Sequence, residues 1–224
     1  MNEEVKEVTL YTDGACEPNP GPGGWGVVLI YGNHRKELSG GFQLSTNNRM
    51  EIIAAIKGLE ALKTLCKVTL YSDSEYLVNA MMQGWVSRWQ RDDWWRNKEE
   101  KAANADLWGK LLDLCNKHHV EFVWIKAHAG NPENERCDQL SLEALKQDDL
   151  TPDEGYQKFV ETKDASKTKV TSEGQPCRSC STPVIKRAPR SKRKPDQLYY
   201  YEYYLYCPKC HAIYLVEGAK RYFE

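Results

Sequence analysis

The sequence predicts a mixed α/β domain followed by a small cysteine-rich β unit. Three strand-like segments come first, and helix-like and strand-like segments then alternate, which is the order expected for one mixed sheet flanked by helices. A polar stretch follows, and two Cys-x-x-C pairs lie near the end of the chain. We therefore expect the α/β domain over 1–147, a flexible polar linker over 148–175 and the cysteine-rich unit over 176–224.

The predicted strands are short runs of β-branched and aromatic residues. The first two are separated by the Gly- and Pro-rich segment 19–24, which is a strong turn signal. The last two alternate with predicted helices, so the pattern indicates five strands in one sheet, at residues 8–12, 25–31, 35–43, 67–72 and 120–125.

The predicted helices show apolar residues at helical spacing, as at Ile52, Ile56 and Leu59. Pro132 suits the first turn of the last helix. At the end of the third helix, His118 and His119 have no chemical context, so we expect both to face solvent. The expected helices cover residues 46–63, 74–83, 104–118 and 132–146, with the Trp-rich, charged stretch 84–103 between the second and the third.

Composition excludes several classes of protein. Hydrophobic residues make up 41% of the chain and charged residues 28%, as in ordinary soluble globular proteins. Apolar runs such as 27–30 are far shorter than the roughly 18 residues that span a bilayer. The N-terminus is acidic and lacks the pattern of a secretory signal, so we expect a cytoplasmic protein with no membrane partner.

The net charge of −1 hides an asymmetry along the chain. Residues 1–150 hold 17 Lys and Arg against 23 Asp and Glu, a net charge of −6, whereas residues 151–224 hold 14 against 9, a net charge of +5. Such a division suggests two units with different roles, of which the basic one is a candidate for nucleic-acid contact.

Four acidic residues occupy positions that link them to the predicted core. Asp13 and Asp73 each end a predicted strand, and adjacent strands of a mixed sheet would place these two carboxylates side by side. Glu51 and Asp138 lie in predicted helices. Converging carboxylates repel one another unless a cation neutralises them, and Mg²⁺ is the natural partner for such oxygen ligands. The alternative is that each acid is a helix cap or a solvated surface group.

Five segments, in order along the chain, resemble type 1 ribonuclease H over about residues 5–147. Any one of them alone is a weak signal, but the ordered set is highly specific. The segments are 11–16 (YTDGAC), 19–26 (NPGPGGWG), 46–51 (TNNRME), 72–76 (SDSEY) and 128–138 (HAGNPENERCD).

The resemblance implies an endonuclease that cuts the RNA strand of an RNA–DNA hybrid and leaves 3′-hydroxyl and 5′-phosphate ends. Asp13, Glu51, Asp73 and Asp138 match the carboxylates that bind two Mg²⁺ ions in the family, with Mn²⁺ as a possible substitute. His128 matches the mobile catalytic histidine of the family; without the motif it is simply a histidine in a surface loop.

The resemblance also implies substrate contacts by short polar side chains, which suit the shallow minor groove where the 2′-hydroxyls are exposed. Position 75 departs from the family pattern, because Gln is common there and Glu adds negative charge near the metals. The implied contacts are to the RNA from Asn19, Asn48 and Glu75, and to the DNA strand from Thr46 and Asn47.

Two tryptophans match aromatic positions at the substrate-binding protrusion of the family, Trp85 and Trp108. Core packing is the alternative for both, and we favour it for Trp108. Bacterial family members often carry a strongly basic protrusion, but residues 88–101 here have a net charge of only +1. This predicts weaker attraction of phosphates by this element.

The C-terminal unit carries two cysteine pairs separated by 26 residues. Two such pairs provide the four thiolates of a tetrahedral Zn²⁺ site, and in so small a unit the metal contributes much of the stability. We therefore predict one structural Zn²⁺ in a zinc-ribbon-like fold, held by Cys177, Cys180, Cys207 and Cys210. The alternative is a set of redox-active or disulfide-bonded thiols. His211 is not expected to be a ligand.

A basic run and an aromatic run lie between and beside the cysteine pairs. Residues 186–194 contain six cations and no acid, and residues 199–206 contain six tyrosines, in a segment where we expect a strand over 198–206. A second strand is expected over 212–216. Cations beside aromatic rings suit phosphate attraction and base stacking. The alternative is a solvated loop and an ordinary aromatic strand face.

Three other functions compete with a two-domain, monomeric hybrid nuclease. One is a catalytically silent module that binds hybrids or duplexes, and the complete acidic set argues against it. Another is a polynucleotidyl transferase, which the absence of a further strand-transfer domain disfavours. In the third, the tail recruits a protein such as a replication factor instead of binding nucleic acid.

Overall fold

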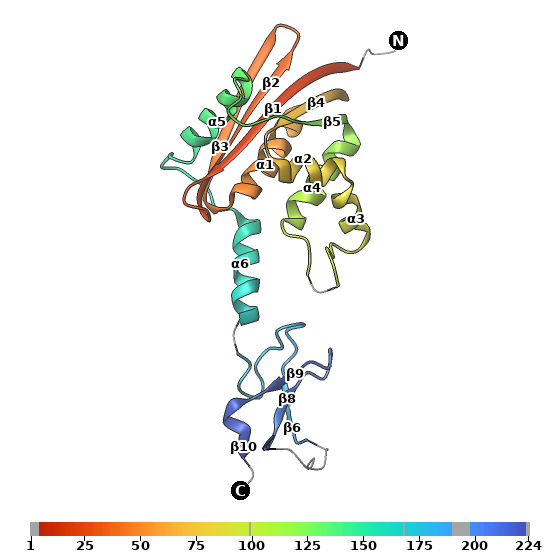
Figure 1. The fold of residues 1–224 in the computed structure, drawn as a ribbon, viewed down its shortest axis with the longest axis vertical. Helices are drawn as coiled ribbons and strands as arrows, with labels where there is room; N and C mark the ends of the chain where they lie inside the picture. Colours follow the sequence, from red (N-terminus) through yellow and green to blue (C-terminus); the bar gives the residue numbers. More distant parts are fainter. Residues whose placement is uncertain (1–4, 99, 168, 190–197, 223–224) are drawn as a thin grey trace. The chain divides into compact units, whose positions relative to one another are not determined.

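The computed structural model describes residues 5–98, 100–167, 169–189 and 198–222 (Figure 1). They form two compact units, residues 1–157 and residues 158–224, which are described separately below.

The first unit is built on the predicted five-stranded mixed sheet, in the order β3-β2-β1-β4-β5. Strand β1 pairs antiparallel with β2 and parallel with β4; β3 joins β2 antiparallel, and β5 joins β4 parallel. The strands are β1 (Lys6–Cys16), β2 (Gly21–Tyr31), β3 (His34–Ser45), β4 (Cys66–Ser72) and β5 (His119–Trp124). The fold class predicted from the sequence is confirmed.

Helices cover both faces of this sheet. Helix α5 (Pro132–Ala144) packs on β1, β2 and β3, while α1 (Asn47–Glu60) packs on β1 and β2 and contacts α2 and α4 (Figure 1). The remaining helices are α2 (Glu75–Met82), α3 (Trp85–Arg91) and α4 (Ala105–Lys117). Helix α3 falls in the Trp-rich stretch for which no element was predicted.

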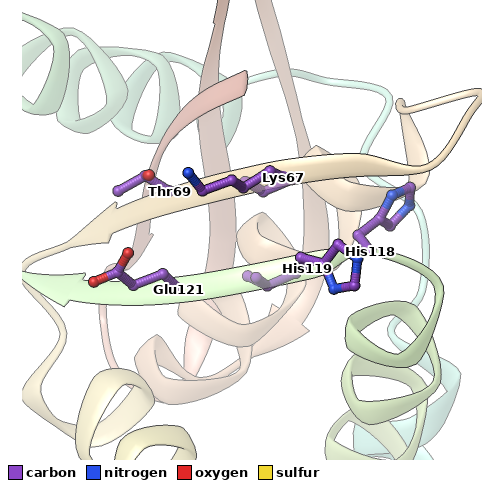
Figure 2. Close-up of a pocket in the computed structure, with 7 residues that line it drawn as sticks. Lys67, Thr69, His118, His119 and Glu121 are labelled. Atoms are coloured by element: carbon purple, nitrogen blue, oxygen red, sulfur yellow. The ribbon is translucent and has the colours of Figure 1, made fainter. Parts of the chain in front are cut away.

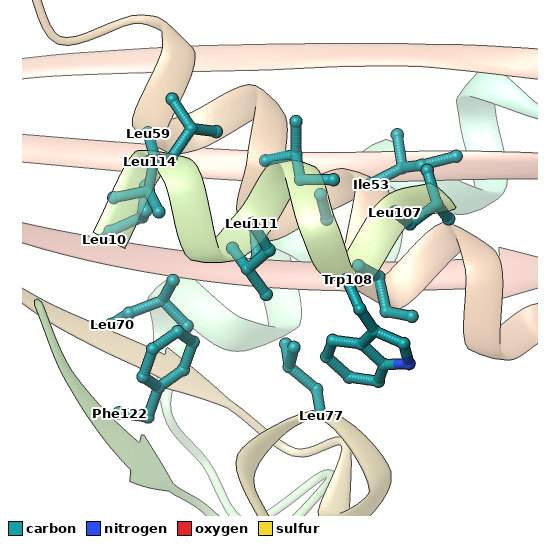
Figure 3. Packing of buried hydrophobic residues seen from close by; sticks show 14 of the residues in the cluster. Leu10, Ile53, Leu59, Leu70, Leu77, Leu107, Trp108, Leu111, Leu114 and Phe122 are labelled. Atoms are coloured by element: carbon teal, nitrogen blue, oxygen red, sulfur yellow. The ribbon is translucent and has the colours of Figure 1, made fainter. Parts of the chain in front are cut away.

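The main core lies between the sheet and helices α1, α2 and α4. Leu10 and Leu70 from adjacent strands meet Leu77 of α2 and Leu111 of α4, all fully buried (Figure 3). Trp108 is also fully buried in this cluster, so the core-packing interpretation of this residue is confirmed.

The prediction that His118 faces solvent is wrong. Its side chain is buried at the end of α4, where its Nδ1 accepts a hydrogen bond of 3.3 Å from the backbone N–H of Cys66. Burial lowers the pKa of His118, and the charge of Lys117 acts in the same direction. Of these two histidines, His119 is the exposed one, and it lies at the start of β5.

The predicted flexible linker over 148–175 is also corrected. Thr151 forms a parallel bridge with Phe42, and Asp153 is buried against Arg49 with two hydrogen bonds of 2.7 and 2.8 Å. Asp153 also accepts a hydrogen bond from the N–H of Tyr156 at the start of helix α6 (Glu154–Lys167). The polar composition concealed this helix because it has few apolar residues to mark a periodicity.

The second unit contains short strands around a small core. Strand β8 (Tyr204–Tyr206) lies between β6 (Ile185–Arg187) and β9 (Ile213–Leu215), and β7 (Tyr199–Tyr201) pairs with β10 (Lys220–Tyr222) after a 3-10 turn at Glu217–Ala219. Leu205, Tyr214 and Ala219 are buried together. The strand predicted over 198–206 is therefore two strands, and β9 confirms the strand predicted over 212–216.

The ion pair between Arg49 and Asp153 predicts an unequal response to two substitutions. Asp153→Ala leaves a buried guanidinium with one fewer partner and should lower the free energy of unfolding by about 2–4 kcal/mol. Asp106 is the other partner of Arg49, and its side chain is 46% exposed. Asp106→Ala should therefore lower the free energy of unfolding by about 1 kcal/mol or less. Urea unfolding followed by Trp fluorescence reports the first unit alone, because all seven tryptophans lie there. Equal losses would contradict this assignment.

Candidate active site and cysteine cluster

Strand register brings Asp13 and Asp73 together. The parallel pairing of β1 with β4 ends at Tyr11 and Tyr71, whose rings stack with centroids 4.9 Å apart. Asp13 lies two residues after Tyr11 and Asp73 lies two residues after Tyr71, so both acids are at the same level of the sheet. The expectation that adjacent strands bring these carboxylates side by side therefore agrees with the structure.

Glu51 joins the pair because α1 packs very closely on β1. A methyl group at Gly14 would overlap the backbone of Met50 and Glu51, so only glycine permits this approach. As a result, carboxylate oxygens of Asp13, Glu51 and Asp73 all lie within 4.8 Å of one another. The close approach of α1 therefore explains why a glycine follows Asp13 in the sequence.

Asp138 approaches from the opposite face of the sheet. Side chains at Gly24 or Gly26 of β2 would overlap the backbone of α5, so this helix also lies directly on the strands. Asp138 is half-buried and lies outside the group of three within 4.8 Å. Its charge nevertheless acts on Asp13, where it raises the pKa.

The electrostatics of the cluster indicate a site for cations. Burial, together with the charges of Asp73 and Asp138, raises the pKa of Asp13 from 3.8 to about 7, against a hydrogen bond from the Gly14 N–H. Burial and the charges of Asp13 and Asp73 also raise the pKa of Glu51. The buried Glu51 Oε2 has no hydrogen-bond partner within the described residues. Oxygen ligands of this kind fit hard divalent cations.

Asn134 is a site residue that the sequence did not single out by itself. Its Nδ2 donates a hydrogen bond of 2.9 Å to Asp73 Oδ2, and its own backbone N–H is fixed by the Asn131 side chain that caps α5. Asn134 lies within the motif segment 128–138, which was the available signal. The amide orients the Asp73 carboxylate.

His128 lies in an exposed loop between β5 and α5. Its backbone φ is +50°, in the left-handed region, and Gly130 follows at +83°. The structure thus places this histidine outside the group of three carboxylates. Its exposed position is compatible with a side chain that moves.

The polar residues implied to contact substrate gather around the start of α1. Thr46 caps the helix by accepting from the Arg49 N–H, and Asn19 Oδ1 accepts a hydrogen bond of 3.2 Å from the Asn47 N–H. Asn19 and Asn48 are exposed. This hydrogen bond brings the 17–20 turn beside the helix, so four of these residues share one surface.

The other two implied contacts lie on α2 and α3. Glu75 is exposed at the first position of α2, directly after the Ser74 cap and two residues from Asp73. Trp85 begins α3 and is half-buried against the core, with its ring centroid 6.3 Å from that of Trp89.

A pocket at the other end of β4 and β5 is separate from this site. It is lined by Lys67, Thr69, His118, His119 and Glu121, near the beginning of the two strands (Figure 2). Asp73 follows the end of β4, so the length of the strand separates the pocket from the carboxylates.

The second unit brings its four cysteines into one cluster. The Sγ atoms of Cys177, Cys180, Cys207 and Cys210 lie within 4.8 Å of one another. The two closest pairs, Cys177 with Cys210 and Cys180 with Cys207, are each 3.4 Å apart, so each contact joins one Cys-x-x-C pair to the other. None of the eight cysteines, all of which are described, forms a disulfide.

Each cysteine pair lies on a turn of the same geometry. The N–H of Ser181 donates to the carbonyl of Cys177, and the N–H of His211 donates to that of Cys207. Ser181 and His211 both have φ near +60°. The Tyr214 hydroxyl lies 3.1 Å from Cys177 Sγ, and the His211 ring hydrogen-bonds with Tyr206 instead of joining the cluster. Four sulfurs from two equivalent turns fit a tetrahedral soft-metal site.

The fold and the acidic cluster define an α/β protein that gathers carboxylates where its central parallel strands end. A profile of the RNase H family matches residues 5–146. The chain belongs to this family, and its resemblance to type 1 ribonuclease H is confirmed. The expectation that it is an enzyme of this kind is confirmed as well.

Named relatives and a solved structure agree. A ribonuclease H of Syntrophus aciditrophicus is 66% identical over 151 residues, which cover 67% of this chain and 87% of that protein. One from Rippkaea orientalis is 60% identical over 163 residues, 72% of this chain and 100% of that protein. The crystal structure of LC9-RNase H1, a type 1 RNase H with the type 2 active-site motif, superposes with a TM-score of 0.59 at 28% identity, covering 71% of this chain and 83% of that one.

Over the described ranges, we find no helix with enough apolar length to cross a membrane.

The raised pKa of Asp13 predicts how stability depends on pH without divalent cations. Between pH 4 and pH 7 the Asp13 carboxyl binds more protons in the folded state than in the unfolded state, so its contribution to stability should fall as the pH rises through this interval. Asp13→Asn removes the buried charge and retains an acceptor for Gly14, so it should raise the free energy of unfolding at pH 8 by about 1–3 kcal/mol. Urea unfolding of wild type and variant at pH 5 and pH 8 measures this difference. The exposed substitution Asp92→Asn is the control, and a gain from Asp13→Asn that is no larger at pH 8 than at pH 5 would refute the account.

Proposed function

We propose that this chain is an endonuclease that hydrolyses the RNA strand of RNA–DNA hybrids and leaves 3′-hydroxyl and 5′-phosphate ends. The observation that carries the proposal is the convergence of Asp13, Glu51 and Asp73 within 4.8 Å in an RNase H fold. Buried carboxylates at this spacing are costly unless cations join them, so the site is suited to metal-assisted hydrolysis of a phosphodiester.

The metal ligands in this proposal are Asp13, Glu51, Asp73 and Asp138. When bound, two Mg²⁺ ions, or Mn²⁺ in their place, would activate the attacking water and neutralise charge on the leaving 3′-oxygen. The residues of the chain prepare the site: Gly14 lets the helix bearing Glu51 approach, and Asn134 orients the carboxylate of Asp73. Asp138 supplies a further carboxylate from α5.

The substrate contacts in this proposal lie around the carboxylates. Asn19, Asn48 and Glu75 are exposed and can hydrogen-bond 2′-hydroxyls or adjacent nucleotides of the RNA strand. Thr46 and Asn47, at the start of α1, face the DNA strand. Trp85 supports the protrusion that contacts the hybrid.

His128 is proposed to move a proton or to assist departure of the phosphate product. Its exposed loop position gives the imidazole freedom to approach and leave the scissile phosphate. An imidazole gains or loses a proton near neutral pH, which suits both roles.

The cysteine cluster is proposed to hold one structural Zn²⁺. Four Sγ atoms on two turns of equal geometry suit tetrahedral thiolate coordination, and hydrogen bonds from Tyr214 and from the Ser179 N–H outweigh burial to hold the pKa of Cys177 at about 6. This donor set favours a metal over a disulfide or a redox pair.

The C-terminal unit is proposed to add affinity for nucleic acid. The protrusion at 88–101 has a net charge of only +1, whereas residues 151–224 carry +5. Of the basic run 186–194, positions 190–194 lie outside the described residues, but Lys186 and Arg187 are exposed on β6. Positive charge in this unit compensates for the weakly charged protrusion.

Cleavage of labelled duplexes tests the proposed activity. With Mg²⁺, wild-type protein should cut the RNA strand of an RNA–DNA hybrid and leave RNA–RNA and DNA–DNA duplexes intact. Asp13→Asn or Asp73→Asn should reduce kcat by about 1000-fold, because each removes a ligand to charge-neutralising cations. Glu121→Gln makes the same chemical change near the far end of β5 and should leave kcat unaltered.

Three results would contradict the nuclease proposal. Binding of hybrids without cleavage in Mg²⁺ would indicate the catalytically silent module, joining of strands would indicate a polynucleotidyl transferase, and equal activity of wild type and Asp73→Asn would remove the carboxylate site.

A chain that ends after Lys167 tests the role of the tail. This end point keeps Asp153 and the whole of α6, whereas a cut near residue 150 would remove a partner of Arg49. We expect KM for a hybrid to rise about tenfold with little change in kcat, and the salt dependence of KM to weaken, since fewer phosphates are neutralised. An unchanged KM and salt dependence would show that the tail does not anchor substrate.

Metal analysis tests the cysteine cluster. Purified protein should contain one zinc per chain, and Cys177→Ser should lose most of it and make the second unit sensitive to protease, because so small a core depends on the metal. Cys115→Ala, which alters a cysteine outside the cluster, should keep the zinc. Full zinc content in Cys177→Ser would exclude this site.

A further inference from the structure

The three-stranded sheet of the second unit has an inner and an outer face. Leu205 and Tyr214 occupy equivalent positions on β8 and β9 and are buried. Because side chains alternate along a strand, their neighbours point to the other face. In the register of the sheet, the outer residues form two rows: Ile185, Tyr206 and Ile213, and Arg187, Tyr204 and Leu215.

The outer face is unusually apolar for an exposed surface. Ile213 and Leu215 are 60% and 61% exposed, and Ile185 is 37% exposed. Ile213 and Leu215 are neighbours on the outer side of β9, and Tyr206 of β8 lies between Ile213 and Ile185. Apolar and aromatic side chains therefore continue across the three strands. A contiguous apolar patch on a small folded unit indicates a site of interaction.

Flat and cationic groups accompany the apolar side chains. The guanidinium carbon of Arg187 lies over the Tyr206 ring, 3.8 Å from its centre, so the cation and the ring form a pair. Tyr204 lies in the other row, between Arg187 and Leu215. None of the three strands contains an acidic residue, and Arg187 is exposed. The chemistry of this face therefore complements a polyanion that offers flat apolar rings.

We propose that the outer face of β6-β8-β9 binds single-stranded nucleic acid. Unpaired bases stack on Tyr204 and on the Arg187–Tyr206 pair, Ile213 and Leu215 contact the base edges, and Arg187 attracts the phosphates. A duplex keeps its base faces stacked inside, so the aromatic groups of this face have no partner there. The inference rests on the proposed nucleic-acid role of the tail and assigns this one face of it to unpaired strands.

Binding of a labelled 15-nucleotide oligothymidine to the full-length protein tests the proposal. This DNA is not a substrate for RNA hydrolysis, so its binding is independent of catalysis. Full-length protein should bind it more tightly than the chain that ends after Lys167. Arg187→Gln and Tyr204→Ser should each raise Kd about tenfold, the range expected for loss of one stacking platform.

Lys186→Gln is the matched control. Lys186 precedes Arg187 on β6 and is also exposed. Its side chain lies on the opposite face, where its Nζ is 4.6 Å from the centre of the Tyr203 ring. This variant loses the same charge and should change Kd by less than about twofold. All three variants should retain their zinc, which shows that the second unit is still folded.

The remaining outcomes would overturn the proposal. Full-length and truncated chains of equal affinity would show that the tail does not bind the strand. Unchanged affinity for oligothymidine in both Arg187→Gln and Tyr204→Ser would show that this face does not bind the strand and would favour a protein partner. An equal loss of affinity in Lys186→Gln would indicate that charge attracts the strand without a defined binding face. Failure of the nuclease proposal is distinguishable, because it appears as intact hybrids in Mg²⁺ and leaves oligothymidine binding unaffected.

Discussion

The mutual repulsion of buried carboxylates is the constraint on which the rest of the first unit depends. Asp13, Glu51 and Asp73 converge from the ends of two strands and from a helix, and burial opposes the negative charge of Asp13 and of Glu51. A folded chain keeps such groups together only if the packing around them is strong. The apolar cluster beneath α1, α2 and α4 provides that packing, and cations bound as proposed would relieve the repulsion.

Glycine positions translate this constraint into backbone geometry. Gly14 lets α1 lie on β1 from one side of the sheet, and Gly24 and Gly26 let α5 lie on β2 from the other. Acidic side chains on the two helices are thereby drawn toward the same end of the central strands. The Gly-rich motifs and the acidic motifs of the sequence therefore serve the same site. The glycines determine how closely the helices approach the strands, and this approach determines how close the carboxylates lie to one another.

Much of the fold and of the site could be predicted because it is local. Alternating apolar residues indicated the strands. The positions of Asp13 and Asp73 at strand ends predicted that their carboxylates lie side by side. The ends of β1 could not be predicted, because its last residues pair with glycines of β2 and carry no apolar alternation. The buried environments of His118 and Asp153 escaped prediction because each depends on a partner more than fifty residues away.

The ion pair of Arg49 and Asp153 determines where the chain can be divided without loss of stability. The family profile ends at residue 146, yet Asp153 is anchored to a helix of the nuclease fold. The nuclease unit therefore extends beyond the matched segment and includes the residues up to the start of α6. A protein cut at the end of the family match would leave the buried guanidinium of Arg49 with one partner fewer, so a boundary chosen from the match alone would give a destabilised nuclease.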